Sequence, residues 1–269
     1  MFLTVLVDNN TIIDEYYIGE PGLSFYIEDE DIKILFDCGY SNVFIENMKK
    51  LNLSTYNIDV LAISHGHDDH VGGIKYLAQE KLNPSLKIIG HSLAFNKKIK
   101  NNQCISSPLD INGMKNMGEV QLSKGPIKIS ENIYFLGEIP STMGFEPRHS
   151  IGEIEIDNKY EKDFIYDDTA LVYKGKEGLF IITGCSHSGI CNIVEYAKKV
   201  CNENSVIGII GGTHLREYND RANKTLEYFK DNNINKLYLG HCTSFEVKSY
   251  IHSSIPITEV GVGLKLEIN

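Results

Sequence analysis

The sequence predicts an α/β protein in which two packed sheets carry helices on their outer faces. Short β-branched runs alternate with segments of helical periodicity, which is typical of layered α/β proteins. Several runs are continuously apolar, as expected for strands buried on both faces. Further strand-like runs surround this alternating part, and they favour two packed sheets over one open parallel sheet.

The first ninety residues contain most of the clear signals. The expected strands are short apolar runs punctuated by glycine and acidic residues, and they span Leu3–Val7, Leu23–Ile27, Ile32–Phe36, Asp59–Ser64 and Leu86–Gly90. A helix is expected over Val43–Leu51, where Phe44, Met48 and Leu51 have helical spacing. A second helix is expected over Val71–Ala78.

The segment Ser92–Asp163 is the least regular part, because it is rich in Lys, Asn, Gly and Ser. Only Ile133–Leu136 predicts a strand there, and the Lys-rich run Asn96–Lys100 is interpreted as a solvated face. The second half returns to alternating elements. We expect strands over Ala170–Tyr173, Leu179–Thr183, Val206–Ile210 and Lys236–Leu239, and helices over Ile193–Val200 and Ala222–Lys230.

Composition excludes several classes of protein. The chain has 269 residues and a formal net charge of −10, with 42% hydrophobic and 23% charged residues, so neither disorder nor a coiled coil is expected. This acidic balance argues against nucleic-acid binding. The beginning of the chain lacks a secretory pattern, and no run is long enough to span a bilayer. With six cysteines and no disulfide framework, we expect a cytoplasmic protein.

The segment Ser64–Gly73 carries the most specific chemical signal. It follows an expected buried strand and holds His65, His67, Asp69 and His70 within six positions. Side chains at i and i+2 of an extended loop point the same way, so His65 and His67 can hold one ion together. Asp69 and His70 follow at the turn into the helix and can hold a second ion. The alternative, a solvated polar loop, does not account for this density of ligands.

Three strands of the second half each end in a histidine. His187 lies in Thr183–Gly189, His214 lies in Gly211–Leu215, and His241 follows Gly240. Ligands in α/β folds gather at the carboxyl ends of strands, so these histidines are expected to meet the first group. Because both halves close around one site, residues 1–269 are predicted to form a single domain.

The H-x-H-x-D-H motif resembles the signature of the metallo-β-lactamase superfamily. The resemblance implies a four-layer αββα sandwich with the motif at one edge. The phrases Leu136–Pro140 and Asp167–Leu171 are similar to those of one branch, the dihydropterin–ribofuranosylaminobenzene phosphate synthase-like proteins. The name of that branch implies a condensation in the synthesis of a methanopterin-type cofactor.

The resemblance implies a site for two divalent metal ions. Zinc is the first expectation, and iron or manganese are the alternatives. The implied ligands are imidazoles and one carboxylate, namely His65, His67, Asp69, His70, His187 and His241. Asp69 is also implied to act in catalysis by positioning a water or receiving its proton, and Asp37 is implied to orient a ligand histidine from behind.

The sequence departs from the superfamily pattern in its second half, because it contains no Gly-His-Thr phrase. His187 would then replace the usual bridging aspartate, or Asp168 would enter the site from the preceding strand. His214 would bind either metal or substrate. Cys185 and Cys242 flank the site, and apolar packing is the favoured interpretation for both.

The expected function is hydrolysis of a small, phosphate-bearing molecule by a water that two metal ions activate. Arg148 and Arg216 are candidates for binding the phosphate. The alternatives are the synthase reaction and, with iron, an oxidoreductase. A homodimer is expected on the resemblance alone.

Overall fold

The first of two large sheets is built mainly from the amino-terminal part of the chain. The computed structural model describes residues 1–269. The sheet has seven strands, in the spatial order β17 (Lys265–Glu267), β1 (Phe2–Val7), β2 (Ser24–Asp29), β3 (Ile32–Phe36), β4 (Val60–Ala62), β5 (Lys87–Gly90) and β8 (Glu119–Leu122). From β17 to β3 neighbouring strands are antiparallel, and from β3 to β8 they are parallel.

The second large sheet is built mainly from the carboxyl-terminal part. Its six strands follow the order β16 (Lys236–Leu239), β15 (Val206–Gly211), β14 (Leu179–Thr183), β13 (Ala170–Lys174), β10 (Ile133–Phe135) and β9 (Ile127–Lys128). Strands β14, β15 and β16 are parallel, whereas β13, β10 and β9 continue the sheet in antiparallel pairs.

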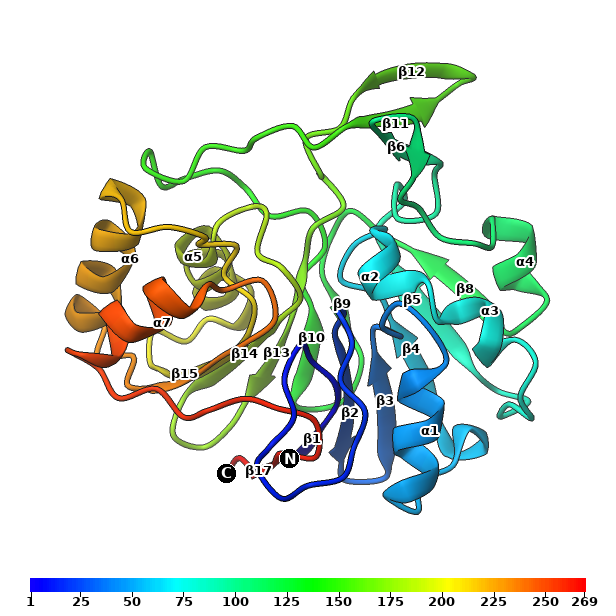
Figure 1. Ribbon diagram of the computed structural model, residues 1–269, viewed down its shortest axis with the longest axis horizontal. Coiled ribbons are helices and arrows are strands. Elements are labelled where there is room, and N and C mark those ends of the chain that lie inside the picture. The colour runs from blue at the N-terminus through cyan, green and yellow to red at the C-terminus, as the bar shows by residue number, and fades with distance from the viewer.

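Helices cover the outer face of each large sheet (Figure 1). The first sheet carries α1 (Val43–Lys50), α2 (Asp68–Val71), α3 (Ile74–Leu77) and α4 (Ile111–Lys115). The second sheet carries α5 (Ile190–Cys201), α6 (Asp220–Asp231) and α7 (Phe245–His252), and a short 3₁₀ turn spans Thr55–Asn57. The predicted four-layer αββα sandwich is therefore confirmed. None of these helices has the length and apolar character that crossing a bilayer requires.

Three apolar clusters fill the three spaces between the four layers. The central cluster lies between the sheets, where Phe25 and Phe36 stack with ring centroids 6.4 Å apart and Phe180 approaches from the other sheet. A second cluster packs α5, α6 and α7 onto the second sheet, and a third packs α1 to α4 onto the first. Strands that contribute to two clusters are buried on both faces, which explains their continuous apolar runs.

The segment Ser92–Asp163 contains more strands than the sequence predicts. It forms a third, four-stranded sheet in the order β12 (Lys159–Lys162), β11 (Glu153–Ile156), β6 (Lys98–Lys100) and β7 (Gln103–Cys104). This sheet projects from the sandwich (Figure 1). Its strands have two to four residues, and both β7 and β12 are exposed, so no apolar alternation marks them.

The expected helix Val71–Ala78 is wrong in its bounds. It begins at Asp68 and is divided into α2 and α3 at Gly72 and Gly73. A Cβ atom on Gly73 would lie 2.1 Å from the carbonyl oxygen of Cys38, so the glycine permits close packing against the loop after β3. This packing fixes the junction between α2, which carries the second part of the histidine-rich motif, and α3.

Removing the Phe180 side chain should destabilise the sandwich strongly. Phe180 is fully buried in the central cluster, so Phe180→Ala is expected to lower the free energy of unfolding by about 3–5 kcal/mol. Phe245 is 82% exposed on α7, and Phe245→Ala should change it by less than about 0.5 kcal/mol. Urea denaturation of both variants measures the difference, and equal effects would contradict the placement of the central core.

Candidate metal centre

The candidate site lies where six strands end at one edge of the two large sheets. Strands β1, β3, β4, β14, β15 and β16 all deliver their carboxyl ends there, and the polar residues that follow them include Asn9, Asp37, His65, Cys185, His214 and His241. Parallel strands place such ends side by side, which is why ligands gather at this edge in α/β folds. Residues far apart in the sequence thus meet at one place.

The first group of ligands contains His65, His67 and His187. Nε2 of His65 lies 3.0 Å from Nδ1 of His67, and the ring centroid of His187 lies 4.8 Å from that of His65 and 5.1 Å from that of His67. Burial lowers the pKa of His65 and His187 well below the ordinary value and lowers that of His67 to about 4. All three imidazoles are therefore neutral near pH 7, as metal ligands must be.

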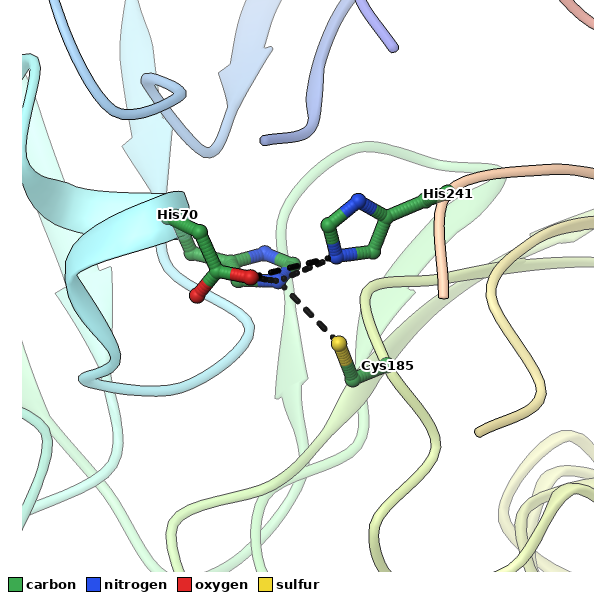
Figure 2. A group of neighbouring side chains, drawn as sticks. His70, Cys185 and His241 are labelled. Atoms are coloured by element: carbon green, nitrogen blue, oxygen red, sulfur yellow. Dashed lines mark hydrogen bonds and ion pairs between the residues drawn. The ribbon is translucent and has the colours of Figure 1, made fainter. Parts of the chain in front are cut away.

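The second group contains Asp69, His70, Cys185 and His241, whose ligand atoms lie within 4.8 Å of one another. Nε2 of His70 is 3.2 Å from both Nε2 of His241 and Sγ of Cys185 (Figure 2). Oδ2 of Asp69 lies 3.4 Å from Nε2 of His241 and 3.8 Å from Nε2 of His70. These groups come from α2, from the loop after β14 and from the loop after β16.

The first group fits a metal ion by a test that does not depend on the motif. Nε2 of His67 and Nε2 of His187 are buried and have no hydrogen-bond partner in the protein. A buried polar atom without a partner costs about 1–3 kcal/mol, and a cation at this place would satisfy both nitrogens. Imidazole, carboxylate and thiol donors suit zinc, and the same set also suits iron or cobalt.

Asp37 orients His70 by binding the ring nitrogen that points away from the site. Oδ2 of Asp37 accepts a hydrogen bond of 2.6 Å from Nδ1 of His70, and the same carboxylate accepts from the backbone and hydroxyl of Ser64. This leaves Nε2 of His70 facing the site, as the sequence predicts for Asp37. Burial would lower the pKa of His70, but Asp69 and Asp37 raise it to about 9, so this corner favours positive charge.

Residues that follow β1 orient His241 in a similar way. The backbone N–H of His241 donates to Oδ2 of Asp8 at 2.8 Å, and its Nδ1 lies 3.0 Å from Oδ1 of Asn9. The sequence analysis missed Asp8 and Asn9. Their position directly after the first expected strand is a signal that could have found them, because five other strands end at the same edge.

His187 does not lie between the two groups, so the interpretation of it as a bridging residue is wrong. It groups with His65, whereas the ligand atoms near both groups are Sγ of Cys185 and a carboxylate oxygen of Asp69. Asp168 does not enter the site either. It is buried, and one of its oxygens accepts hydrogen bonds from the backbone and hydroxyl of Ser188, so it holds the loop that carries His187.

His214 lies beside His187, with ring centroids 4.3 Å apart, and its backbone N–H donates to Sγ of Cys242 at 3.3 Å. Its buried Nδ1 has no hydrogen-bond partner in the protein, and its ligand atom groups with the sulfurs of Cys185 and Cys242. This nitrogen is therefore free to bind either a metal ion or a substrate, and both alternatives for His214 stay open.

A pocket of about 740 Å³ opens above both ligand groups. His67, Asp69, His187 and His241 are among its lining residues, and so are two cationic side chains, Lys100 and Arg216. Lys100 comes from β6, so the small third sheet contributes to the wall of the pocket.

Arg148 does not line the pocket, which is contrary to the expectation that it binds the phosphate. Its guanidinium donates to the carbonyl oxygens of Ile165 and Ile139 at 2.7 and 2.9 Å and lies over the ring of Tyr166. It holds the irregular segment together, because backbone carbonyls in a loop need donors.

The interpretation of Asn96–Lys100 as a solvated face is also wrong at Lys98. This side chain is fully buried between Asp163 and Asp167, at 2.8 and 2.7 Å. Asp167 in turn accepts from the backbone N–H of Gly66 at 2.7 Å. The ion group thus ties the third sheet to the loop that carries His65 and His67.

The double variant His65→Ala/His67→Ala is expected to lose at least one of two bound metal equivalents. The two rings supply most of the first group, and Asp69, His70 and His241 would remain to hold a second ion. Elemental analysis of the purified proteins measures this, with His149→Ala as the control because His149 is exposed and outside the pocket. Unchanged metal content in the double variant would contradict the assignment.

Asp37→Asn is expected to weaken metal binding by about 10- to 100-fold, because partners that orient a ligand histidine have effects of that size. Competition with a chromophoric chelator gives the affinity. Asp31→Asn is a matched control, since Asp31 is an exposed carboxylate in the turn between β2 and β3. An affinity equal to that of the unaltered protein would show that Asp37 does not support His70.

Comparisons with known proteins agree with this geometry. Residues 17–241 match the metallo-beta-lactamase superfamily. The 7,8-dihydropterin-6-methyl-4-(beta-D-ribofuranosyl)-aminobenzene-5'-phosphate synthase of Methanocaldococcus jannaschii is 33% identical over 86% of this chain and 83% of its own. An uncharacterized protein of the same organism, MJ0448, is 33% identical over 91% of each chain.

Among solved structures, Tm1679, a metal-dependent hydrolase of the β-lactamase superfamily, superposes with a TM-score of 0.84 and 27% identity. The match covers 100% of this chain and 99% of that one. Both the family match and the shared architecture extend over the strands whose ends carry the ligand groups. The chain belongs to the metallo-β-lactamase superfamily.

Proposed function

We propose that this protein is a binuclear metal-dependent hydrolase acting on a small, phosphate-bearing molecule. The observation that carries the proposal is the placement of two ligand groups side by side beneath one pocket. His65, His67 and His187 would hold one ion, and Asp69, His70 and His241 would hold the other. Two divalent ions so held would lower the pKa of a water and polarise the scissile phosphoester.

Asp69 is the residue we propose to orient the attacking water. Burial would raise its pKa, but the neighbouring rings of His70 and His241 lower the pKa below the ordinary value. The carboxylate is therefore ionised and can accept a hydrogen bond. About a third of its side chain is exposed to the pocket, which gives a water access to it.

Two features of the pocket favour a phosphate-bearing substrate. Lys100 and Arg216 line it in addition to the metal ligands, and cationic donors are the groups that bind phosphate oxygens. Its volume of about 740 Å³ falls within the range of small-molecule sites. Apolar side chains such as Ile105 and Ile151 also line it and would contact an organic part of the substrate.

A second candidate function is supported by the identity of 33% to the synthase from M. jannaschii. The proposed reaction is the condensation of a pterin diphosphate with an aminobenzene ribotide, which would use the same phosphate-binding pocket. The two functions differ in their products. Condensation consumes both organic substrates and releases pyrophosphate, whereas hydrolysis needs only one organic substrate and water.

The test is a panel of substrates given to the metal-loaded protein. We expect turnover of phosphoesters in preference to lactones and thioesters, and loss of turnover in the variant His65→Ala/His67→Ala. Pyrophosphate release that requires both the pterin diphosphate and the aminobenzene ribotide would favour the synthase instead. Turnover of lactones or thioesters alone would contradict a phosphate-bearing substrate.

Arg216→Ala is expected to raise KM for a phosphoester by about tenfold and to change kcat little. A hydrogen bond to a charged group is worth roughly 1.5 kcal/mol or more, and this contact would hold the substrate in the ground and transition states alike. Lys176→Ala is the control, since Lys176 is an exposed cation in the turn between β13 and β14. Steady-state kinetics separates the two constants, and a KM unaffected by Arg216→Ala would remove Arg216 from the binding site.

A further inference from the structure

Cys185 occupies the place between the two ligand groups. Its Sγ belongs with Asp69, His70 and His241, and it also belongs with His65 and His187. The carboxylate of Asp69 is also shared, because it groups with His65 and His67 as well as with His70 and His241. Figure 2 shows the sulfur directed toward His70, at 3.2 Å from Nε2.

The backbone holds this sulfur in place. The carbonyl oxygen of Gly184 accepts from the N–H of Gly212 at 2.8 Å, which ties the loop after β14 to the loop after β15. A Cβ on Gly184 would lie 2.3 Å from Oγ of Ser64, so the loop after β14 packs directly against the motif loop. Ser186 follows with φ of 58°, a left-handed conformation that is costly for a residue other than glycine. The position of the sulfur is therefore built into the fold.

Two divalent metal ions at this site would need more negative charge than one carboxylate supplies. Two divalent ions carry four positive charges, and Asp69 is the one carboxylate in the ligand groups described above. Asp168 belongs to none of these groups, and it hydrogen-bonds to Ser188. A thiol beside a metal ion is deprotonated outright, so Cys185 can supply a second negative charge where both ions would feel it.

We infer that Cys185 is a metal ligand, and that its thiolate is shared by the two ion sites in place of a second carboxylate. On binding, the thiol loses its proton to solvent and the sulfur donates an electron pair to the metal, with no change of oxidation state. A thiolate favours zinc, iron or cobalt over magnesium, calcium or manganese. The inference rests on the proposed binuclear centre and replaces the apolar packing role expected from the sequence.

Cys242 is a natural control. Its sulfur lies in the same pocket and groups with Cys185 and His214, but with none of the histidines of the two ligand groups. It accepts from the backbone N–H of His214, and its thiol faces the carbonyl oxygen of Cys185 at 3.6 Å. Cys242→Ser therefore alters a neighbouring thiol and leaves the inferred ligand in place.

The test is the absorption of the cobalt(II)-loaded protein under reducing conditions, with the bound cobalt counted by elemental analysis. A thiolate bound to cobalt gives a charge-transfer absorption in the near ultraviolet, which imidazole and carboxylate ligands do not give. We expect this absorption in the unaltered protein and in Cys242→Ser, and its loss in Cys185→Ser. Titration should show the absorption still growing as the second equivalent of cobalt binds.

The outcomes separate this inference from the proposed function. Two bound cobalt ions without the absorption would overturn the role of Cys185 and leave the binuclear centre intact. Absorption that disappears in Cys242→Ser but not in Cys185→Ser would have the same meaning. Binding of a single ion would overturn both. If Cys185→Ser does not fold, X-ray absorption of the zinc-loaded unaltered protein decides, because a thiolate ligand places sulfur at about 2.3 Å from zinc.

Discussion

The structure depends on one electrostatic constraint, which is the burial of several imidazoles at a single edge of the sandwich. His65, His67 and His70 lie almost entirely out of solvent, and the free nitrogen of His67 has no partner within the protein. Neutral imidazoles can hydrogen-bond to one another, as His65 and His67 do at 3.0 Å, but no group of the protein satisfies Nε2 of His67 or Nε2 of His187. A cation can, and the carboxylates of Asp69 and Asp37 beside His70 already favour positive charge.

The backbone at several strand ends around the site adopts a left-handed conformation. Asp37, Ser186, His214 and His241 all follow strand ends with positive φ, in a left-handed conformation that costs roughly 1–3 kcal/mol for a residue other than glycine. Each of these turns redirects the chain as it leaves the sheet and brings a side chain toward the site. The three apolar clusters of the sandwich provide the stability that such local strain requires.

The small third sheet connects substrate access with the metal loop. Lys98 lies buried between Asp163 and Asp167, and Asp167 binds the backbone of Gly66 inside the motif. Lys100, two residues from Lys98 on the same strand, lines the pocket. The wall of the pocket and the loop that carries His65 and His67 are therefore held by one buried ion group. Removing one member of such a group would leave an uncompensated buried charge, so the connection is costly to break.

The sequence by itself determined the layered fold and most residues of the candidate site, because both depend on local patterns. Continuous apolar runs such as Leu179–Thr183 reflect burial on two faces, and the spacing from His65 to His70 is short enough to act within one loop. Only the tertiary structure decided the partners of Lys98, Arg148 and Cys185, which lie far away along the chain. A lysine or a cysteine looks the same in sequence whether it meets solvent, a carboxylate or a metal site. What distinguishes these cases is the close approach of strand ends that the packing of the two sheets brings about.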